Sequence, residues 1–173
     1  MDTMFRRVSV REFDDEPLEP KTMKKLMRAA MTAPSAGNQQ PWEFYLVTDA
    51  EKRGKLAACS KFAGPAENAP LVIVACSRNR GMRHGEYVIQ DMSACVENIL
   101  LEAVELGLGA VWLGIAPREG RMELVRNVLN IPAHLDPFAL IAVGHPAGEV
   151  PEQKNRFEID RVHFVTLPEE RFA

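Results

Sequence analysis

The sequence predicts an α+β domain built on a mixed, mostly antiparallel sheet. Segments with helical periodicity alternate with short apolar segments of strand type, and the gaps between them do not repeat as regular βαβ units. The chain has 173 residues, of which 46% are hydrophobic and 26% are charged. This length and composition suit one globular domain with a sizeable core.

Helices are expected over residues 19–33, 49–60, 86–106 and 118–130. Pro20 suits the first turn of the first helix, and Asp49 suits the N-cap of the second. The third helix is apolar on most sides, with one stripe formed by Val88, Met92, Val96, Ile99, Ala103 and Leu106. Such a helix must be buried on most sides, which favours a partner subunit; the alternative is a central helix within one monomer.

Strands are expected over residues 42–48, 71–77 and 107–117, and a last strand with its turn over residues 138–149. Two connecting segments, residues 61–70 and 78–85, have the composition of loops. The tail is polar apart from a strand-like segment at residues 161–167. An isolated strand needs a sheet edge, and the edge of a partner subunit is the natural candidate.

Composition excludes several functional classes. The formal net charge of -3 and a pI near 5.8 argue against a nucleic-acid surface. The N-terminus has no signal-peptide core, and the longest apolar run is too short to span a membrane. Cys59, Cys76 and Cys95 form no CxxC pair, so we expect them to pack in the core of a cytoplasmic protein. The four histidines lack metal-ligand spacing, so no metal site is expected.

Two basic clusters and one polar segment are candidate binding sites. Arg7, Ser9 and Arg11 alternate, so in an extended segment they would converge on one anion such as a phosphate; the alternative is a solvated basic terminus. Lys154 and Arg156 repeat this spacing in the tail. The segment "APSAGNQQPWEF", residues 33–44, places hydroxyl and amide groups directly before a core strand, where they would suit the edge of a planar heterocycle.

On these segments, together with "GLGAVWLGI", the chain resembles the nitroreductase family of FMN-dependent oxidoreductases. The resemblance covers nearly the whole chain and implies an intertwined homodimer with an FMN-binding core at residues 1–150. The arm at residues 151–173 would then pack on the partner subunit. Two FMN sites at the interface are implied, with no catalytic acid or base.

The resemblance also implies a role for each candidate residue. Arg7, Val8, Ser9 and Arg11 would form the first flavin-binding motif, with Arg11 near the N1–O2 edge of the ring. The loop residues Pro34, Ser35, Ala36 and Asn38 would reach the flavin ring of the other subunit. The backbone of Leu113 and Gly114 would approach flavin N5, and Lys154 and Arg156 would bind the phosphate. A further ring contact before Leu71 is left open between Lys61 and Asn68.

The implied reaction is ping-pong hydride transfer from NADH or NADPH through flavin N5 to a nitroaromatic, quinone or flavin acceptor. Two alternatives stay open. One is flavin fragmentation or reductive dehalogenation on the same scaffold, and the other is a non-catalytic flavin carrier or sensor. Relative to many members of the family, the chain is short between its long helix and Val111, which leaves the physiological acceptor and the lid over the substrate undefined.

Overall fold

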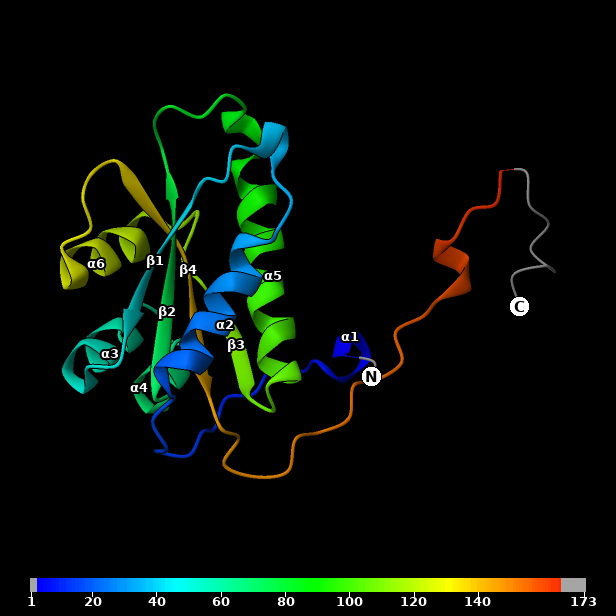
Figure 1. The fold of residues 1–173 in the computed structure, drawn as a ribbon, viewed down its shortest axis with the longest axis horizontal. Helices are drawn as coiled ribbons and strands as arrows, with labels where there is room; N and C mark the ends of the chain where they lie inside the picture. The colour runs from blue at the N-terminus through cyan, green and yellow to red at the C-terminus, as the bar shows by residue number, and fades with distance from the viewer. Residues whose placement is uncertain (1–2, 166–173) are drawn as a thin grey trace.

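A four-stranded antiparallel sheet divides residues 3–165, the part of the chain described by the computed structural model, into two helical layers (Figure 1). The strands are β1 (Trp42–Val47), β2 (Leu71–Arg78), β3 (Gly109–Gly114) and β4 (Leu135–Gly144). They lie in the order β1-β2-β4-β3, and each neighbouring pair is antiparallel. The predicted α+β class with a mostly antiparallel sheet is confirmed.

Helices cover both faces of this sheet. Helices α2 (Pro20–Met31) and α5 (Val88–Glu105) pack on one face, and α3 (Ala50–Ala57), α4 (Pro65–Asn68) and α6 (Glu119–Leu129) pack on the other. Alternate residues of β2 therefore enter different cores. Ile73 faces α2 and α5, whereas Val74 faces the opposite layer. Because both faces are covered, this strand is a continuous apolar segment rather than an alternating one.

Local signals placed the helix starts correctly. Pro20 occupies the first turn of α2, and the Asp49 carboxylate accepts a hydrogen bond of 2.8 Å from the Lys52 N–H at the start of α3. The loop prediction for residues 61–70 is wrong in part, because Pro65 begins the short helix α4.

Two strand boundaries also differ from the prediction. Strand β3 covers Gly109–Gly114, shorter than the predicted 107–117, and β4 begins at Leu135 instead of residue 138. The added residues include Pro137, which lies at a register shift between β2 and β4. A proline is tolerated at such an irregularity because its missing N–H breaks no regular ladder bond.

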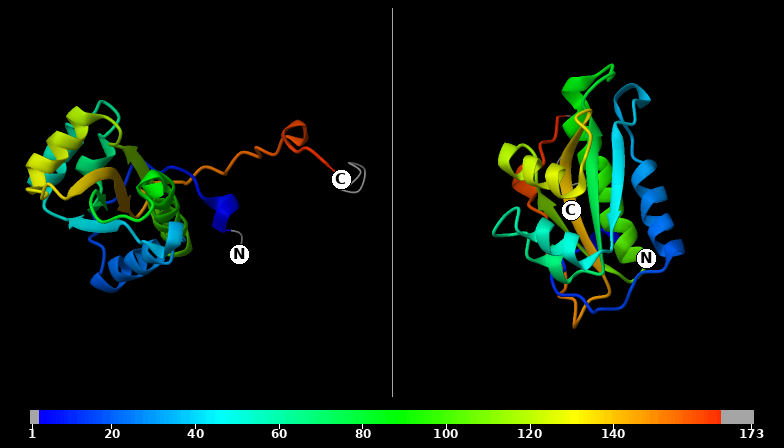
Figure 2. Two further views of the ribbon diagram at one scale, coloured as in Figure 1. Left: turned by 90° about the horizontal axis from the view of Figure 1, so that it is seen from above. Right: turned by 90° about the vertical axis from the view of Figure 1, so that its left-hand side faces the viewer.

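The C-terminal arm leaves the sheet and extends away from it, on the side where α1 (Thr3–Arg6) also lies (Figure 2). The strand predicted over residues 161–167 is not formed in its described part, residues 161–165. A single 3-10 turn, Ile159–Arg161, precedes them instead, and residues 166–167 lie outside the described chain. A strand needs a neighbouring edge for its backbone hydrogen bonds, and the arm runs away from both edges of its own sheet.

The N-terminal segment is attached to the outer edge of β3. Ser9 pairs with Ala110 in a parallel bridge, and the Val10 N–H donates to the Ala110 carbonyl at 3.1 Å. Gly109 makes this approach possible, because a Cβ there would lie 2.6 Å from the Val10 side chain. The absence of a side chain at Gly109 therefore fixes the path of the segment that carries Ser9 and Arg11.

We expect Gly109→Ala to destabilise the fold by about 1–3 kcal/mol, because the added methyl group overpacks the contact with Val10. Urea unfolding would measure the change. Gly54→Ala is the matched control, since a Cβ at that position of α3 meets nothing within 4 Å. It should be neutral or stabilising. Equal stability of the two variants would contradict the assigned role of Gly109.

Two of the three cysteines are core residues, as expected. Cys76 is buried on β2 and Cys95 is buried on α5, and burial raises the pKa of each thiol to about 12. Cys59 is partly buried, and desolvation raises its pKa as well. A raised pKa keeps each thiol protonated and weakly reactive at neutral pH.

Candidate functional site

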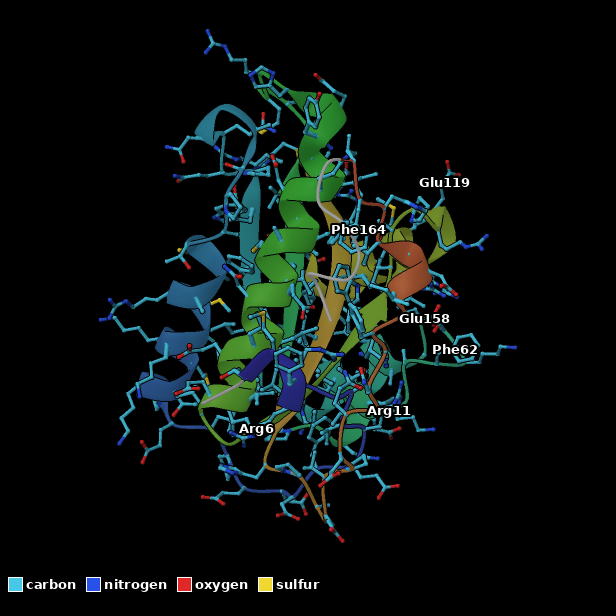
Figure 3. All side chains as sticks on the ribbon, turned by 90° about the vertical axis from the view of Figure 1, so that its right-hand side faces the viewer. Arg6, Arg11, Phe62, Glu119, Glu158 and Phe164 are labelled. Carbon is cyan, nitrogen blue, oxygen red and sulfur yellow. The ribbon has the colours of Figure 1, made fainter. Side chains whose placement is uncertain are left out.

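A cavity of about 470 Å³ lies over the end of the edge strand β3. Its size falls in the range of small-molecule sites. The N-terminal segment contributes Arg11, β3 contributes its last four residues, α6 contributes Arg121, and the loop before α4 with Pro65 contributes the rest of the lining. Two of the lining residues, Arg11 and Phe62, are labelled in Figure 3. The lining residues are Arg11, Ser60, Lys61, Phe62, Gly64, Pro65, Val111, Trp112, Leu113, Gly114 and Arg121.

The charged residues that line this cavity are all cationic: Arg11, Lys61 and Arg121. Arg11 donates to the Ser9 carbonyl at 3.2 Å, and Arg121 donates to the Gly114 carbonyl at 2.8 Å. The Lys61 ammonium lies 5.0 Å from the centre of the Phe62 ring. Three cations and an exposed aromatic ring favour an anionic ligand with a planar part.

Gly114 leaves one wall of the cavity open. A Cβ at this position would meet nothing within 4 Å, so the backbone can be approached closely by a flat ligand. The neighbouring Leu113 is only 6% exposed and packs into the core cluster beneath the strand. The end of β3 is thus held rigidly by its core side while its outer side stays accessible.

The four residues of the first basic motif do not all face this cavity. Arg11 also lines an adjacent hollow of about 220 Å³ together with Ser9. Val8 lines a different cavity of about 500 Å³ beside α1. Arg7 points elsewhere, since its Nε lies 3.5 Å from the Glu97 carboxylate of α5. The structure therefore brings together Ser9 and Arg11, but not Arg7.

The loop containing Pro34, Ser35, Ala36 and Asn38 lies far from this cavity within one chain. It leads directly into β1, and β1 and β3 are opposite edges of the sheet. Ser35 Oγ accepts from the Gln40 N–H at 3.0 Å, and Asn38 Oδ1 accepts from Gln40 Nε2 at 2.9 Å. In one chain, these residues and Gly114 do not form a common site.

Lys154 and Arg156 are exposed on the C-terminal arm. The arm contacts the N-terminal segment just before them, where Gln153 Nε2 donates to the Arg7 carbonyl at 2.9 Å. This contact attaches the arm, directly before Lys154, to the segment that carries the first basic motif. Neither Lys154 nor Arg156 lines the cavity on β3.

Sequence reasoning missed Ser60, Phe62 and Arg121 as cavity residues. It left Lys61 and Asn68 as alternatives, and the structure places Lys61 on the cavity, whereas Asn68 is exposed at the end of α4. An aromatic residue beside a lysine in a Gly- and Pro-containing segment was an available sequence signal for Phe62. The sequence held no such signal for Arg121, because cationic residues are common on the solvent-facing side of amphipathic helices.

This fold and this cationic cavity define a class of protein: a three-layer α+β domain whose sheet edge carries a cavity suited to an anionic, partly planar small molecule. The sequence profile described as the nitroreductase family matches residues 4–79 and 59–145. The chain belongs to the nitroreductase family, as its motifs predicted. The expectation of an oxidoreductase enzyme is confirmed with it.

Individual relatives agree with this assignment. A protein of Archaeoglobus fulgidus, provisionally named NADH dehydrogenase/NAD(P)H nitroreductase, is 39% identical over 92% of this chain and 94% of its own length. A crystal structure provisionally named NADH oxidase, from Clostridium acetobutylicum, has a TM-score of 0.92 and 42% identity over 96% of this chain and all of that one. An FMN-dependent nitroreductase of Clostridium difficile has a TM-score of 0.86 and 28% identity, covering 95% and 98% of the two chains. Within residues 3–165, none of the helices is long and apolar enough to cross a membrane.

Proposed function

We propose that this protein is an FMN-dependent oxidoreductase that takes hydride from NADH or NADPH and passes it to a nitroaromatic, quinone or flavin acceptor. The observation that carries the proposal is the cationic cavity on β3, which is open at Gly114. An FMN-dependent nitroreductase with the same fold supports the choice of cofactor. When bound, FMN supplies a ring that accepts hydride at N5 and releases it to a second substrate.

The residues present fit this cofactor. Ser9 and Arg11 would bind its phosphate or the polar edge of its ring, and the open backbone at Gly114 would accept the flat face. Lys61 and Arg121 would add positive charge next to the ring. A nearby positive charge stabilises the anionic form of a bound group, so these side chains would favour the anionic, reduced form of the flavin. Arg7 would act less directly, because Glu97 already neutralises it.

A homodimer completes the proposed site. The helix α1 and the arm lie on the same side of the sheet (Figure 2), and each carries an exposed aromatic residue: Phe5 on α1 is 69% exposed and Phe157 on the arm is 62% exposed. Such residues are typical of an interface between subunits. In the proposed dimer, the Pro34–Asn38 loop of one protomer reaches the cavity of the other. In this dimer, residues 1–150 form the core and residues 151–173 form an arm that packs on the partner.

We also propose a cytoplasmic location, because the three cysteines are free thiols and a reducing compartment keeps thiols unpaired.

The test is the visible spectrum of the purified protein, titrated with NADH and then NADPH under argon. We expect a flavin spectrum that is bleached by a nucleotide and restored by a nitroaromatic or a quinone. Acid release and chromatography should give FMN and not FAD. A flavin that stays oxidised with both nucleotides would indicate a carrier or sensor. Breakdown of the flavin in oxygen, or release of halide from a haloaromatic, would favour the other reaction types.

Asn38→Ala should weaken FMN binding and alter the absorption band of the bound flavin. Loss of a hydrogen bond of about 0.5–1.5 kcal/mol corresponds to roughly a 2–12-fold weaker Kd. Fluorescence titration with FMN would measure it. The control is Asn68→Ala, which removes an exposed amide that does not line the cavity. If Asn38→Ala matches the parent protein in both affinity and spectrum, the loop is only a surface turn.

A further inference from the structure

Asp91 is a buried carboxylate that the proposed redox reaction does not use. It lies in the first turn of α5 and is 5% exposed. Among the described residues no cation forms an ion pair with it, so its charge must be satisfied by hydrogen bonds. Both donors come from the loop before β1. The Ala36 N–H donates to Oδ1 at 2.9 Å, and Gln39 Nε2 donates to Oδ2 at 2.7 Å.

The Gln39 amide has its orientation fixed by a second neighbour. Its Oε1 accepts from the His84 N–H at 3.0 Å, and its Nε2 donates to the His84 carbonyl at 3.0 Å. Because Oε1 must face the His84 N–H, Nε2 must face Asp91. Position 91 therefore needs a side chain that only accepts hydrogen bonds, and a carboxylate meets this requirement.

The loop that Asp91 contacts is strained. Gly37, Asn38 and Gln40 have φ angles of 55°, 55° and 47°, in the left-handed region that costs non-glycine residues about 1 kcal/mol or more. A Cβ at Gly37 would also lie 2.9 Å from the His84 ring. Conformations of this kind persist only where the surrounding structure holds them in place.

This conformation decides which polar groups the loop presents. Ser35 Oγ and Asn38 Oδ1 both already accept hydrogen bonds from Gln40. The Ser35 hydroxyl hydrogen and the Asn38 amide hydrogens are left to donate outward. A loop held in this way offers donors, and the polar edge of a flavin ring consists largely of acceptor atoms.

We propose that Asp91 is a positioning residue for the cofactor site. Through Ala36 and Gln39 it holds the Pro34–Gln40 loop in the conformation in which Ser35 and Asn38 donate to the flavin of the partner subunit. This inference rests on the proposed function, since it assumes the flavin and the dimer. It adds that affinity for the ring depends on a carboxylate that does not touch the ring.

The first test is Asp91→Asn. The substituted side chain keeps the acceptor for Ala36 but turns an N–H toward Gln39 Nε2, so that two donors face each other. Leaving such a buried group unpaired costs about 1–3 kcal/mol, so FMN affinity should fall roughly 5–150-fold. Hydrogen exchange of the Ala36 amide should accelerate in the flavin-free protein, which reports on the loop without any activity assay.

Asn98→Ala is the matched control. Asn98 lies on the same helix and donates to the Ala29 carbonyl of α2 at 3.0 Å, so the variant also loses one α5 hydrogen bond. We expect its FMN affinity to stay within about 2-fold of the parent, even where its thermal stability falls as much as that of Asp91→Asn. The double variant Asp91→Asn, Gln39→Glu returns an acceptor to face the new amide, but the His84 carbonyl loses the donor that it has in the parent protein, so the rescue is incomplete. It should recover part of the affinity and restore the absorption band of bound flavin.

Each outcome decides the inference. Unchanged Ala36 exchange in Asp91→Asn would overturn the role of Asp91 in holding the loop. Faster exchange with unchanged FMN affinity and spectrum would overturn its role toward the flavin. Equal losses of affinity in Asp91→Asn and Asn98→Ala would show a merely structural effect. If Asp91→Asn does not fold, Gln39→Ala takes its place with the same expectations. If the parent protein binds no flavin, the proposed function itself fails.

Discussion

Gly114→Val should lose FMN while keeping the fold. A Cβ at this position would meet nothing within 4 Å, and Gly114 lines the cavity proposed for the flavin, so a bulkier side chain there would compete with the ring for space. Overpacking of that site costs about 1–3 kcal/mol, which corresponds to roughly a 5–150-fold weaker Kd for FMN. Stability without flavin should be unchanged or improved, since valine suits a strand better than glycine. Flavin titration and thermal unfolding of the flavin-free protein would measure the two effects.

A graded comparison separates steric exclusion from a general loss of flexibility. Gly114→Ala should fall between the parent and Gly114→Val in FMN affinity. Gly120→Ala is its control, because Gly120 lies on α6 and a Cβ there also meets nothing within 4 Å. If Gly114→Val retains the parent's affinity, the flavin does not lie against the end of β3.

Truncation after Pro151 should abolish FMN retention and weaken the dimer together. The removed arm carries Lys154 and Arg156, which the family resemblance implies as phosphate contacts although they do not line the cavity within one chain, as well as the segment expected to pack on the partner. It also carries Gln153, which donates to the Arg7 carbonyl and attaches the arm to the first basic motif. Light scattering and flavin content after gel filtration would measure both effects. A truncated protein that stays a yellow dimer would contradict both the role of the arm in FMN binding and its role in the dimer.

The double variant Lys154→Ala, Arg156→Ala should separate charge from packing. Two charge-assisted hydrogen bonds of about 1.5–3 kcal/mol each correspond to an FMN affinity lower by on the order of 10²–10⁴-fold. The variant should stay dimeric, because the rest of the arm is intact. Arg161→Ala is the control, since that cation is already paired with Glu158 at 2.7 Å. Loss of the dimer together with the flavin would show that charge and packing are not separable here.

Local sequence signals were sufficient for most of the fold. The run 71–77 predicted β2, the proline at position 20 predicted the start of α2, and Asp49 predicted an N-cap. They failed where tertiary contacts decide. Pro137 is accepted in β4 because a register shift accompanies it, and no sequence pattern shows that shift. The segment at residues 161–165 has strand composition but forms no strand, because strand formation depends on a neighbouring edge.

The candidate site was predicted only in part. Arg11, Leu113 and Gly114 meet at one cavity, but a motif read along the chain could not show that Arg7 turns toward Glu97. Nor could it find Arg121, which approaches Gly114 only because α6 packs beside the end of β3. The buried Asp91 was missed for a related reason. In the sequence it is one acidic residue in a helix, and its two donors lie 52 and 55 residues away.

The two buried cysteines, Cys76 and Cys95, can report on the separation of each helical layer from the sheet. Cys76 belongs to the core between the sheet and α3, α4 and α6, whereas Cys95 belongs to the core between the sheet and α2 and α5. An alkylating reagent attacks the thiolate, and both thiols are sheltered, with pKa values near 12 while the fold is intact. Modification of either thiol therefore waits for its own layer to separate from the sheet. The relative rates at the two positions would show whether the halves of the protein come apart together or in sequence.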